Sequence, residues 1–178
     1  VIYRLAGGAV SFTGNTTAFV EMEEWINEQG LAVGLTSVYP CQCKPGFNAG
    51  LLLRYMLEKC QDVSEAVSCL YHLPIASAQT FTLADTTGKI VLVECNGEHV
   101  QCTDSLGGTS SFETGEFFNV TSAETLLSGV YGFLFQIARK TGKDTVWSVI
   151  YDLKRHKIYR CEGNPGRRRF KEDSRFSF

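Results

Sequence analysis

The sequence has little of several features, and each shortage excludes a class of protein. Proline is scarce, at 4 of 178 residues, and glycine numbers 17, so the composition fits neither a fibrous nor a disordered chain. The longest mostly apolar stretch, residues 129–138, is interrupted by Gly132 and Gln136 and is too short to cross a bilayer. We therefore expect a soluble globular chain with no membrane partner.

Internal repeats, low-complexity segments and Pro/Ser-rich linkers are also missing. Apolar residues make up 44% of the 178 residues, which is enough for a sizeable core. Domains usually hold about 100–200 residues, so this length suits one of them. We therefore predict a single domain over residues 1–178.

Positive charge is scarce in most of the chain and concentrated at its end. Residues 1–153 hold eight basic and sixteen acidic residues, whereas the tail of residues 154–178 holds nine basic and three acidic residues. A basic arm can touch nucleic acid or an anionic surface. More often such an arm is a solvated end, or it pairs with the protein's own acidic residues. We predict no nucleic-acid partner and leave homo-oligomerisation open.

Cysteine is present, but in a pattern that does not suggest disulfides. The seven cysteines are an odd number in a chain large enough to fold without cross-links, so we expect reduced thiols and a cytoplasmic location. Cys60, Cys69 and Cys95 lie in apolar surroundings that are typical of small core residues. We predict that none of the seven is paired and that none is a nucleophile.

Local patterns for a nucleophile–base pair, a metal or a phosphate are weak. Cys41 or Cys43 with His72 is the candidate nucleophile–base pair, but no spacing ties either thiol to the imidazole. The three scattered histidines lack the spacing of a zinc site, and Gly107-Gly108 lacks the lysine of a phosphate loop. We predict no metal and no cofactor.

Hydrophobic periodicity predicts antiparallel hairpins segregated from helices, which is typical of an α+β layered protein. Period-two segments predict strands at residues 17–26, 31–38, 80–84, 89–94, 98–102, 144–153 and 157–161. Helical periodicity and capping patterns predict helices at residues 49–60, between Asp62 and Pro74, and at residues 123–128 and 130–140.

The most informative segment is residues 27–36, Asn-Glu-Gln-Gly-Leu-Ala-Val-Gly-Leu-Thr. It resembles the Asn-Glu-x-Gly-Leu-Ala signature of the linear-amide C–N hydrolases. This branch of the N-terminal-nucleophile hydrolases holds choloylglycine hydrolases, penicillin V acylase and penicillin acyltransferases. Residues 53–67, 81–94 and 144–153 resemble further blocks of the family in the same order. The likeness covers most of the chain apart from roughly residues 103–118 and the extreme tail.

The resemblance implies a four-layer αββα sandwich, here incomplete at the N-terminus, and a hydrolase or acyltransferase acting on linear amides. The implied partners are small N-acyl compounds such as conjugated bile acids or penicillin V. In this family an N-terminal Cys attacks the amide while its own α-amine moves the proton, because an amine with a pKa of about 8 is a base tethered beside the thiol.

Asn27 matches the Asn that the family is expected to place at the oxyanion hole, so it is our candidate catalytic residue. One donor to a developing oxyanion contributes roughly 3 kcal/mol. The alternative, from the residues alone, is that Asn27 supplies the φ > 0 or Asx-turn geometry of a hairpin.

Three features depart from the family pattern. Val1 has no ionisable side chain, so residues 1–178 alone are expected not to hydrolyse amides. Thr103-Asp104 is the nearest match to a second oxyanion donor, and its carboxylate would repel an oxyanion. The segment before Thr121 is short and has no match for the family's arginine. Two hypotheses follow: a longer active parent that supplies the Cys, or a non-catalytic binding or scaffold protein that keeps the fold.

Overall fold

The computed structural model describes residues 2–7, 9–16, 20–37, 43–104, 133–135, 147–153, 155–162 and 168–176. The chain divides into two compact units, one within Val1–Gly108 and one within Thr109–Ser177. The expectation of a single domain over residues 1–178 stays a prediction.

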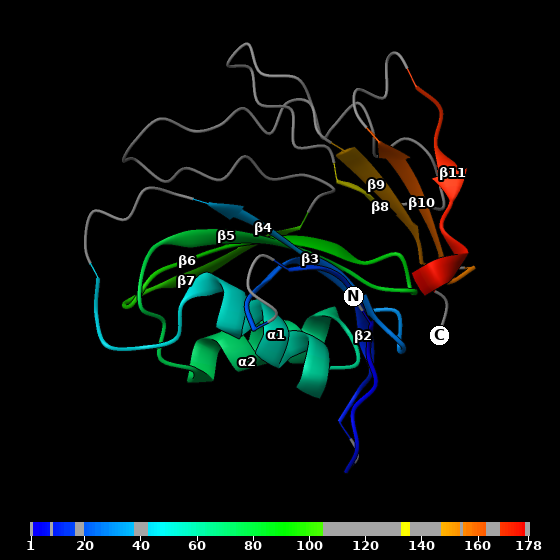
Figure 1. Cartoon of the computed structure of the whole chain (residues 1–178). Helices are drawn as coiled ribbons and strands as arrows, with labels where there is room; N and C mark the ends of the chain where they lie inside the picture. The colour runs from blue at the N-terminus through cyan, green and yellow to red at the C-terminus, as the bar shows by residue number, and fades with distance from the viewer. Residues whose placement is uncertain are drawn as a thin grey trace. The chain divides into compact units, whose positions relative to one another are not determined.

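The described residues of the first unit form a seven-stranded antiparallel sheet whose strands follow chain order (Figure 1). Its strands are β1 (Ile2–Tyr3), β2 (Phe12–Thr16), β3 (Met22–Asn27), β4 (Ala32–Ser37), β5 (Gln79–Ala84), β6 (Ile90–Cys95) and β7 (Val100–Asp104). The predicted β3–β4 and β5–β6 hairpins are confirmed. The short strands β1 and β2 were not predicted, and β7 begins two residues later than expected.

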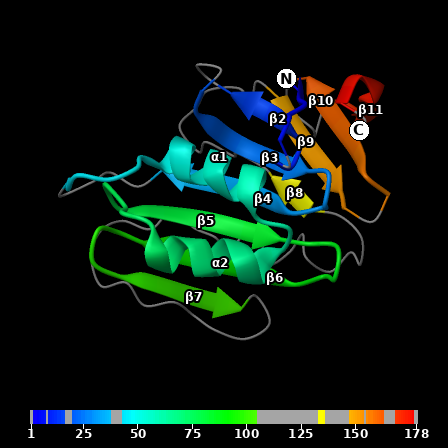
Figure 2. The same cartoon turned by 90° about the horizontal axis from the view of Figure 1, so that it is seen from below.

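Two helices in the described part of the chain lie on one face of this sheet (Figure 2). They are α1 (Ala49–Lys59) and α2 (Val63–His72), as predicted. The side chain of Asp62 accepts the Glu65 N–H at 2.9 Å, and the Glu65 carboxylate in turn accepts the Gln61 N–H at 2.8 Å. These bonds satisfy donors at the start of α2 that have no partner within the helix. Neither helix is long and apolar enough to span a membrane.

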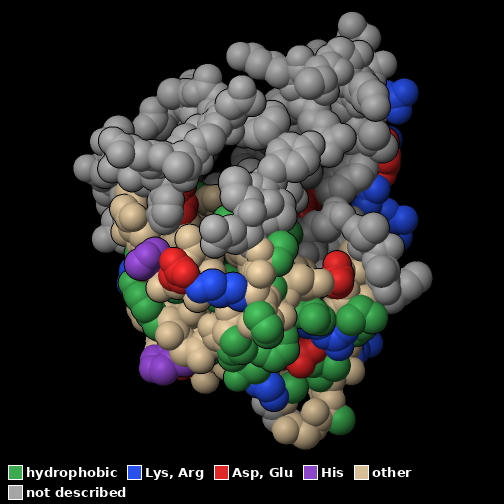
Figure 3. Space-filling view, turned by 90° about the vertical axis from the view of Figure 1, so that its left-hand side faces the viewer, with side chains coloured by type: hydrophobic (Ala, Val, Ile, Leu, Met, Phe, Trp, Pro, Cys, Tyr) green, Lys and Arg blue, Asp and Glu red, His purple; other side chains and the backbone are tan. Residues whose placement is uncertain are grey.

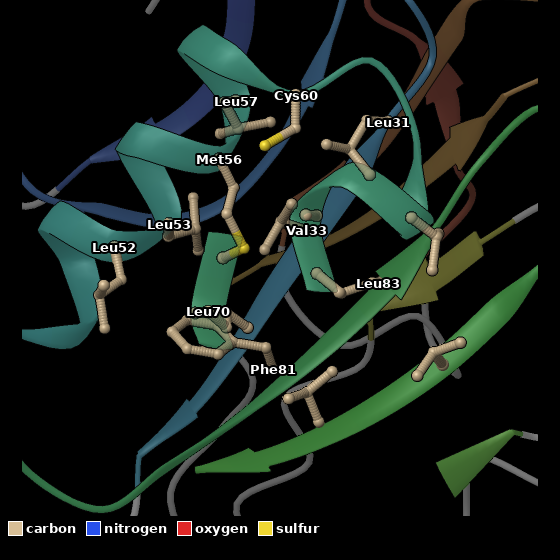
Figure 4. Close-up of a cluster of buried hydrophobic side chains, with 14 of the residues drawn as sticks. Leu31, Val33, Leu52, Leu53, Met56, Leu57, Cys60, Leu70, Phe81 and Leu83 are labelled. Atoms are coloured by element: carbon tan, nitrogen blue, oxygen red, sulfur yellow. The ribbon is translucent and has the colours of Figure 1, made fainter. Parts of the chain in front are cut away.

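The core of the first unit lies between these helices and the sheet (Figure 4). The side chains in contact there are fully buried, and burying one of this size contributes roughly 1.5–3 kcal/mol. The helices and strands contribute Leu52, Leu53, Met56, Leu57, Leu70, Leu31, Val33, Phe81 and Leu83. This packing holds the C-terminal end of α1 against the β3–β4 hairpin.

The described residues of the second unit form a four-stranded antiparallel sheet in the order β11-β10-β9-β8. Its elements are β8 (Phe133–Phe135), β9 (Trp147–Asp152), β10 (Lys157–Glu162), β11 (Lys171–Glu172) and a 3-10 turn (Ser174–Phe176). The predicted β9–β10 hairpin is confirmed. The helix predicted over residues 130–140 is wrong at β8, because periodicity does not distinguish a strand from a helix in a short apolar run. The helix predicted at residues 123–128 lies outside the described residues.

Candidate functional site

Asn27 is the last residue of β3, at the hairpin position predicted for it, and its side chain is 0% exposed. Its N–H donates to the Leu31 carbonyl at 2.9 Å, and its own carbonyl accepts the Gly30 N–H at 2.9 Å. Gly30 has a φ of +88°, a conformation that glycine adopts without steric cost. The left-handed residue of this turn is therefore Gly30.

Both the oxygen and the nitrogen of the Asn27 carboxamide form hydrogen bonds. Its oxygen accepts the N–H groups of Gln29 at 3.1 Å and Leu31 at 2.9 Å, which confirms the Asx-turn hypothesis. Its nitrogen donates to the carbonyls of Leu57 at 3.1 Å and Cys60 at 2.8 Å. Those carbonyls belong to the end of α1, where a helix leaves its last acceptors without internal partners. Asn27 therefore joins the hairpin to the C-terminal end of α1.

These hydrogen bonds occupy the donors that an oxyanion role of Asn27 would need. The backbone N–H and both carboxamide N–H groups of Asn27 donate to main-chain carbonyls. A substrate oxyanion would have to replace one of these bonds to be held by this residue. The geometry favours a positioning role, and the oxyanion role of Asn27 stays a prediction.

Among the described candidates, Cys43 and His72 are not joined by a hydrogen bond. Cys43 is exposed and pairs with Ser77 in an isolated bridge, while Nδ1 of His72 lies 2.7 Å from the carbonyl of Ser68 in its own helix. Cys41 lies outside the described residues. Within the part of the chain that is described, no group of three or more His, Cys, Asp or Glu side chains is placed to hold a metal ion.

Asp85, in the β5–β6 turn, is a buried carboxylate that the sequence analysis did not single out. One of its oxygens accepts the N–H of Val63, the first residue of α2, at 3.2 Å, and the other accepts the Thr87 N–H at 2.9 Å. A carboxylate at this position is stabilised by the positive end of the helix dipole. Asp85 therefore attaches the start of α2 to the β5–β6 hairpin.

Two cysteines that the sequence analysis assigned separately to the core are neighbours. The Sγ atoms of Cys60 and Cys69 lie 3.3 Å apart as thiols. Burial, followed by the hydrogen bond with Cys69, raises the pKa of the Cys60 thiol far above its ordinary value. The spacing of nine residues across a helix–helix junction is the only sequence signal for this contact.

The family described as acyl-coenzyme A:6-aminopenicillanic acid acyl-transferase matches residues 8–109, which is more than half of the chain. The chain belongs to this family. The matched residues include the Asn27 turn, both helices and the strands β2 to β7. The resemblance inferred from the Asn-Glu-x-Gly-Leu-Ala segment is thereby confirmed.

The chain is also similar to three solved structures. A variant of the conjugated bile acid hydrolase from Clostridium perfringens is 12% identical with a TM-score of 0.55, covering 95% of this chain and 83% of that chain. A mutant of the same hydrolase is 12% identical with a TM-score of 0.55, covering 86% and 74%. Penicillin V acylase from Agrobacterium tumefaciens is 18% identical with a TM-score of 0.49, covering 80% and 63%. No curated protein matches the chain. The bile acid hydrolase likeness confirms the α+β N-terminal-nucleophile fold class.

Proposed function

We propose that the chain belongs to an enzyme that hydrolyses linear amide C–N bonds of N-acyl compounds, or transfers their acyl groups. The family match over residues 8–109 carries this proposal. The fold shared with a conjugated bile acid hydrolase supports it. The proposed substrates are small N-acyl amides such as conjugated bile acids or penicillin V, and the cytoplasmic location and the oligomeric state stay predictions.

The proposed chemistry is nucleophilic acyl transfer by an N-terminal Cys of the parent protein. Its sulfur attacks the amide carbon, and its α-amine takes the thiol proton and passes it to the departing amine. The acyl group is left as a thioester. Water then releases the acid in a hydrolase, whereas a second amine accepts the acyl group in an acyltransferase.

The experiment compares residues 1–178 with the whole product of the gene. Each is assayed with penicillin V, glycine-conjugated bile acids and N-acyl amino acids, and the control replaces the N-terminal Cys of the mature parent with Ala. We expect turnover by the whole product and loss of turnover in the control. Turnover by residues 1–178 that depends on an internal Cys would contradict the proposed mechanism.

Asn27 permits a second test in the active form. Asn27→Ser removes the carboxamide donors, and an oxyanion role predicts a kcat lower by roughly 10²–10³ with KM little changed. A positioning role instead predicts a clear loss of stability and a smaller change in kcat at temperatures where the variant is folded. Whether the substitution lowers mainly kcat or mainly stability therefore distinguishes an oxyanion role of Asn27 from a positioning role.

A non-catalytic binding or scaffold protein is the second candidate function. The observation that favours it is that the donors of Asn27 are engaged by main-chain carbonyls. This candidate predicts no turnover by either protein, together with calorimetric binding of the same amides. That pair of results would contradict the enzyme proposal.

A further inference from the structure

Two thiols meet at the junction of α1 and α2. Cys60 follows the last residue of α1, Cys69 lies in the last turn of α2, and their sulfur atoms are 3.3 Å apart. A disulfide bond is about 2.05 Å long and requires two cysteines whose backbones are already close. A closure of about 1.3 Å would therefore bring the sulfur atoms to bonding distance.

The backbone around Cys60 is held in place by hydrogen bonds. Its N–H donates to the Met56 carbonyl at 2.8 Å, and its carbonyl accepts the Asn27 carboxamide at 2.8 Å. Figure 4 shows Cys60 beside Leu57 at the edge of the core. Cys60 is buried, whereas Cys69 is partly exposed, so a small molecule reaches Cys69 first.

We propose that Cys60 and Cys69 are a redox modification site, at which a small-molecule disulfide of the glutathione disulfide class converts the two thiols into a reversible intramolecular disulfide. This site is independent of the proposed acyl chemistry, because neither thiol takes part in that reaction. The expectation that no cysteine is paired or nucleophilic then applies to these two thiols only in the absence of an oxidant.

The exchange proceeds in two balanced steps. Cys69 loses its proton and attacks one sulfur of the small disulfide, forming a mixed disulfide and releasing one small thiol that takes the proton. Cys60 then loses its proton and attacks Cys69 Sγ, forming the Cys60–Cys69 bond and releasing the second small thiol. The two protein thiols are oxidised by two electrons, and the small disulfide is reduced to two thiols.

The burial of Cys60 affects the second step of the exchange. The raised pKa of Cys60 keeps it protonated near neutral pH, so the second step is expected to be slower than the first and to speed up as the pH rises. Cys95 is also buried, but it lies on β6 within the core. Cys95 therefore serves as a matched control.

The test uses the reduced protein, incubated in its folded state with glutathione disulfide, alkylated and cleaved after glutamate. Glu65 lies between the two cysteines, so a peptide from each side stays joined only where Cys60 and Cys69 are linked. We expect the joined peptides to appear, with loss of both thiols to alkylation, and to separate again on addition of a reducing dithiol.

Cysteine variants test whether the joined peptides depend on Cys69. Cys69→Ser and Cys69→Ala should both abolish the joined peptides, whereas Cys95→Ser should keep them. Circular dichroism checks that each variant is folded, and the wild-type result stands without them. A stable glutathione adduct on Cys69 that never links to Cys60, or a link from Cys69 to Cys43 or Cys102 instead, would overturn the proposal. Because the readout is peptide mass, its failure is separate from any failure of the proposed amide chemistry.

Discussion

A single buried carboxamide joins two segments of the first unit that are distant in sequence. Asn27 accepts two N–H groups within its own turn and donates to carbonyls of Leu57 and Cys60, which lie 30 and 33 residues away. Buried polar groups contribute to stability when every partner is present and cost stability when one is removed. The residue that marks the family signature is thus also a main structural contact of α1.

Asn27→Ala is expected to lower the free energy of unfolding by about 2–4 kcal/mol, because two buried carbonyls lose their donor. Urea denaturation measures the loss. The control is Asn96→Ala, in an exposed turn where the side chain accepts the N–H groups of Glu98 at 2.8 Å and His99 at 2.9 Å. Water replaces those bonds, so about 1 kcal/mol or less is expected there. Equal losses would contradict the structural role of Asn27.

The buried thiol of Cys95 is expected to make the protein less stable at alkaline pH. Burial raises the pKa of its thiol to about 12 from an ordinary value of 9.0. Because the folded state holds this proton more tightly than the unfolded state, the contribution is complete below the ordinary value of 9.0 and is lost as the pH rises towards about 12. Cys95→Ala should therefore lose less stability over this range, with a slope shallower by about 1.4 kcal/mol per pH unit. Denaturation at pH 8, 10 and 11 tests this, and identical slopes would refute it.

Among the elements, the short strands β1 and β2 are attached to the sheet by aromatic packing. The rings of Tyr3 and Phe12 stack with centroids 5.1 Å apart, and Phe12 meets Trp25 edge-on at 5.1 Å. The guanidinium of Arg54 on α1 lies 5.2 Å from the centre of the Tyr3 ring. Aromatic pairs of this kind contribute about 0.5–1.5 kcal/mol beyond the area they bury. Their contacts explain how such short strands remain in the sheet.

Close packing of β2 against β3 makes Gly14 a sensitive position. A Cβ there would overlap the Glu24 carbonyl oxygen and lie 2.7 Å from the Trp25 ring. Gly14→Ala is expected to cost about 3 kcal/mol or more, because backbone cannot move aside as a flexible side chain can. Gly88→Ala is the control: it has φ +90° but nothing within 4 Å, so only backbone strain of about 1–2 kcal/mol is expected. Thermal unfolding compares the two, and a smaller effect at Gly14 would contradict the packing.

Over the whole molecule, the basic tail is partly neutralised by its own acidic neighbours. Ion pairs join Lys157 to Glu172 at 2.9 Å and Arg160 to Glu162 at 2.6 Å, and a further pair joins Arg175 to Asp173. Exposed pairs contribute only about 0–1 kcal/mol each, but they reduce the charge offered to a polyanion. Acidic and basic side chains are also interspersed on the described part of the face in Figure 3. The absence of a nucleic-acid partner stays a prediction, which a binding assay at low salt would test.

Unfolding in urea tests the expectation that residues 1–178 form a single domain. A chain that unfolds as one cooperative domain loses all its protected structure at one denaturant concentration. We expect hydrogen exchange of peptides from β3–β4 and from β9–β10 to show the same midpoint in a urea titration. The two peptides come from different compact units, so they report on each unit separately. Separate midpoints would show that the units unfold independently.

Neighbouring residues determined the features that were predicted correctly. The β3–β4 turn follows from Asn27 and Gly30. Their hydrogen bonds within the turn reach residues at most four positions away. The start of α2 follows from Asp62 and Glu65 in the same way. Such interactions recur wherever the local sequence recurs, which is why the family signature can be read from a short segment.

The features that were not predicted depend on contacts between segments that are distant in sequence. The short strand β2 depends on contact with Trp25, and β8 depends on its pairing with β9, so local periodicity was not sufficient to predict either. The carbonyls that occupy the donors of Asn27 come from the end of α1, and Cys60 meets Cys69 only because the two helices fold back on each other. In each case the interaction joins groups whose distance depends on how the chain packs, and packing free energy is a property of the whole unit rather than of any short segment.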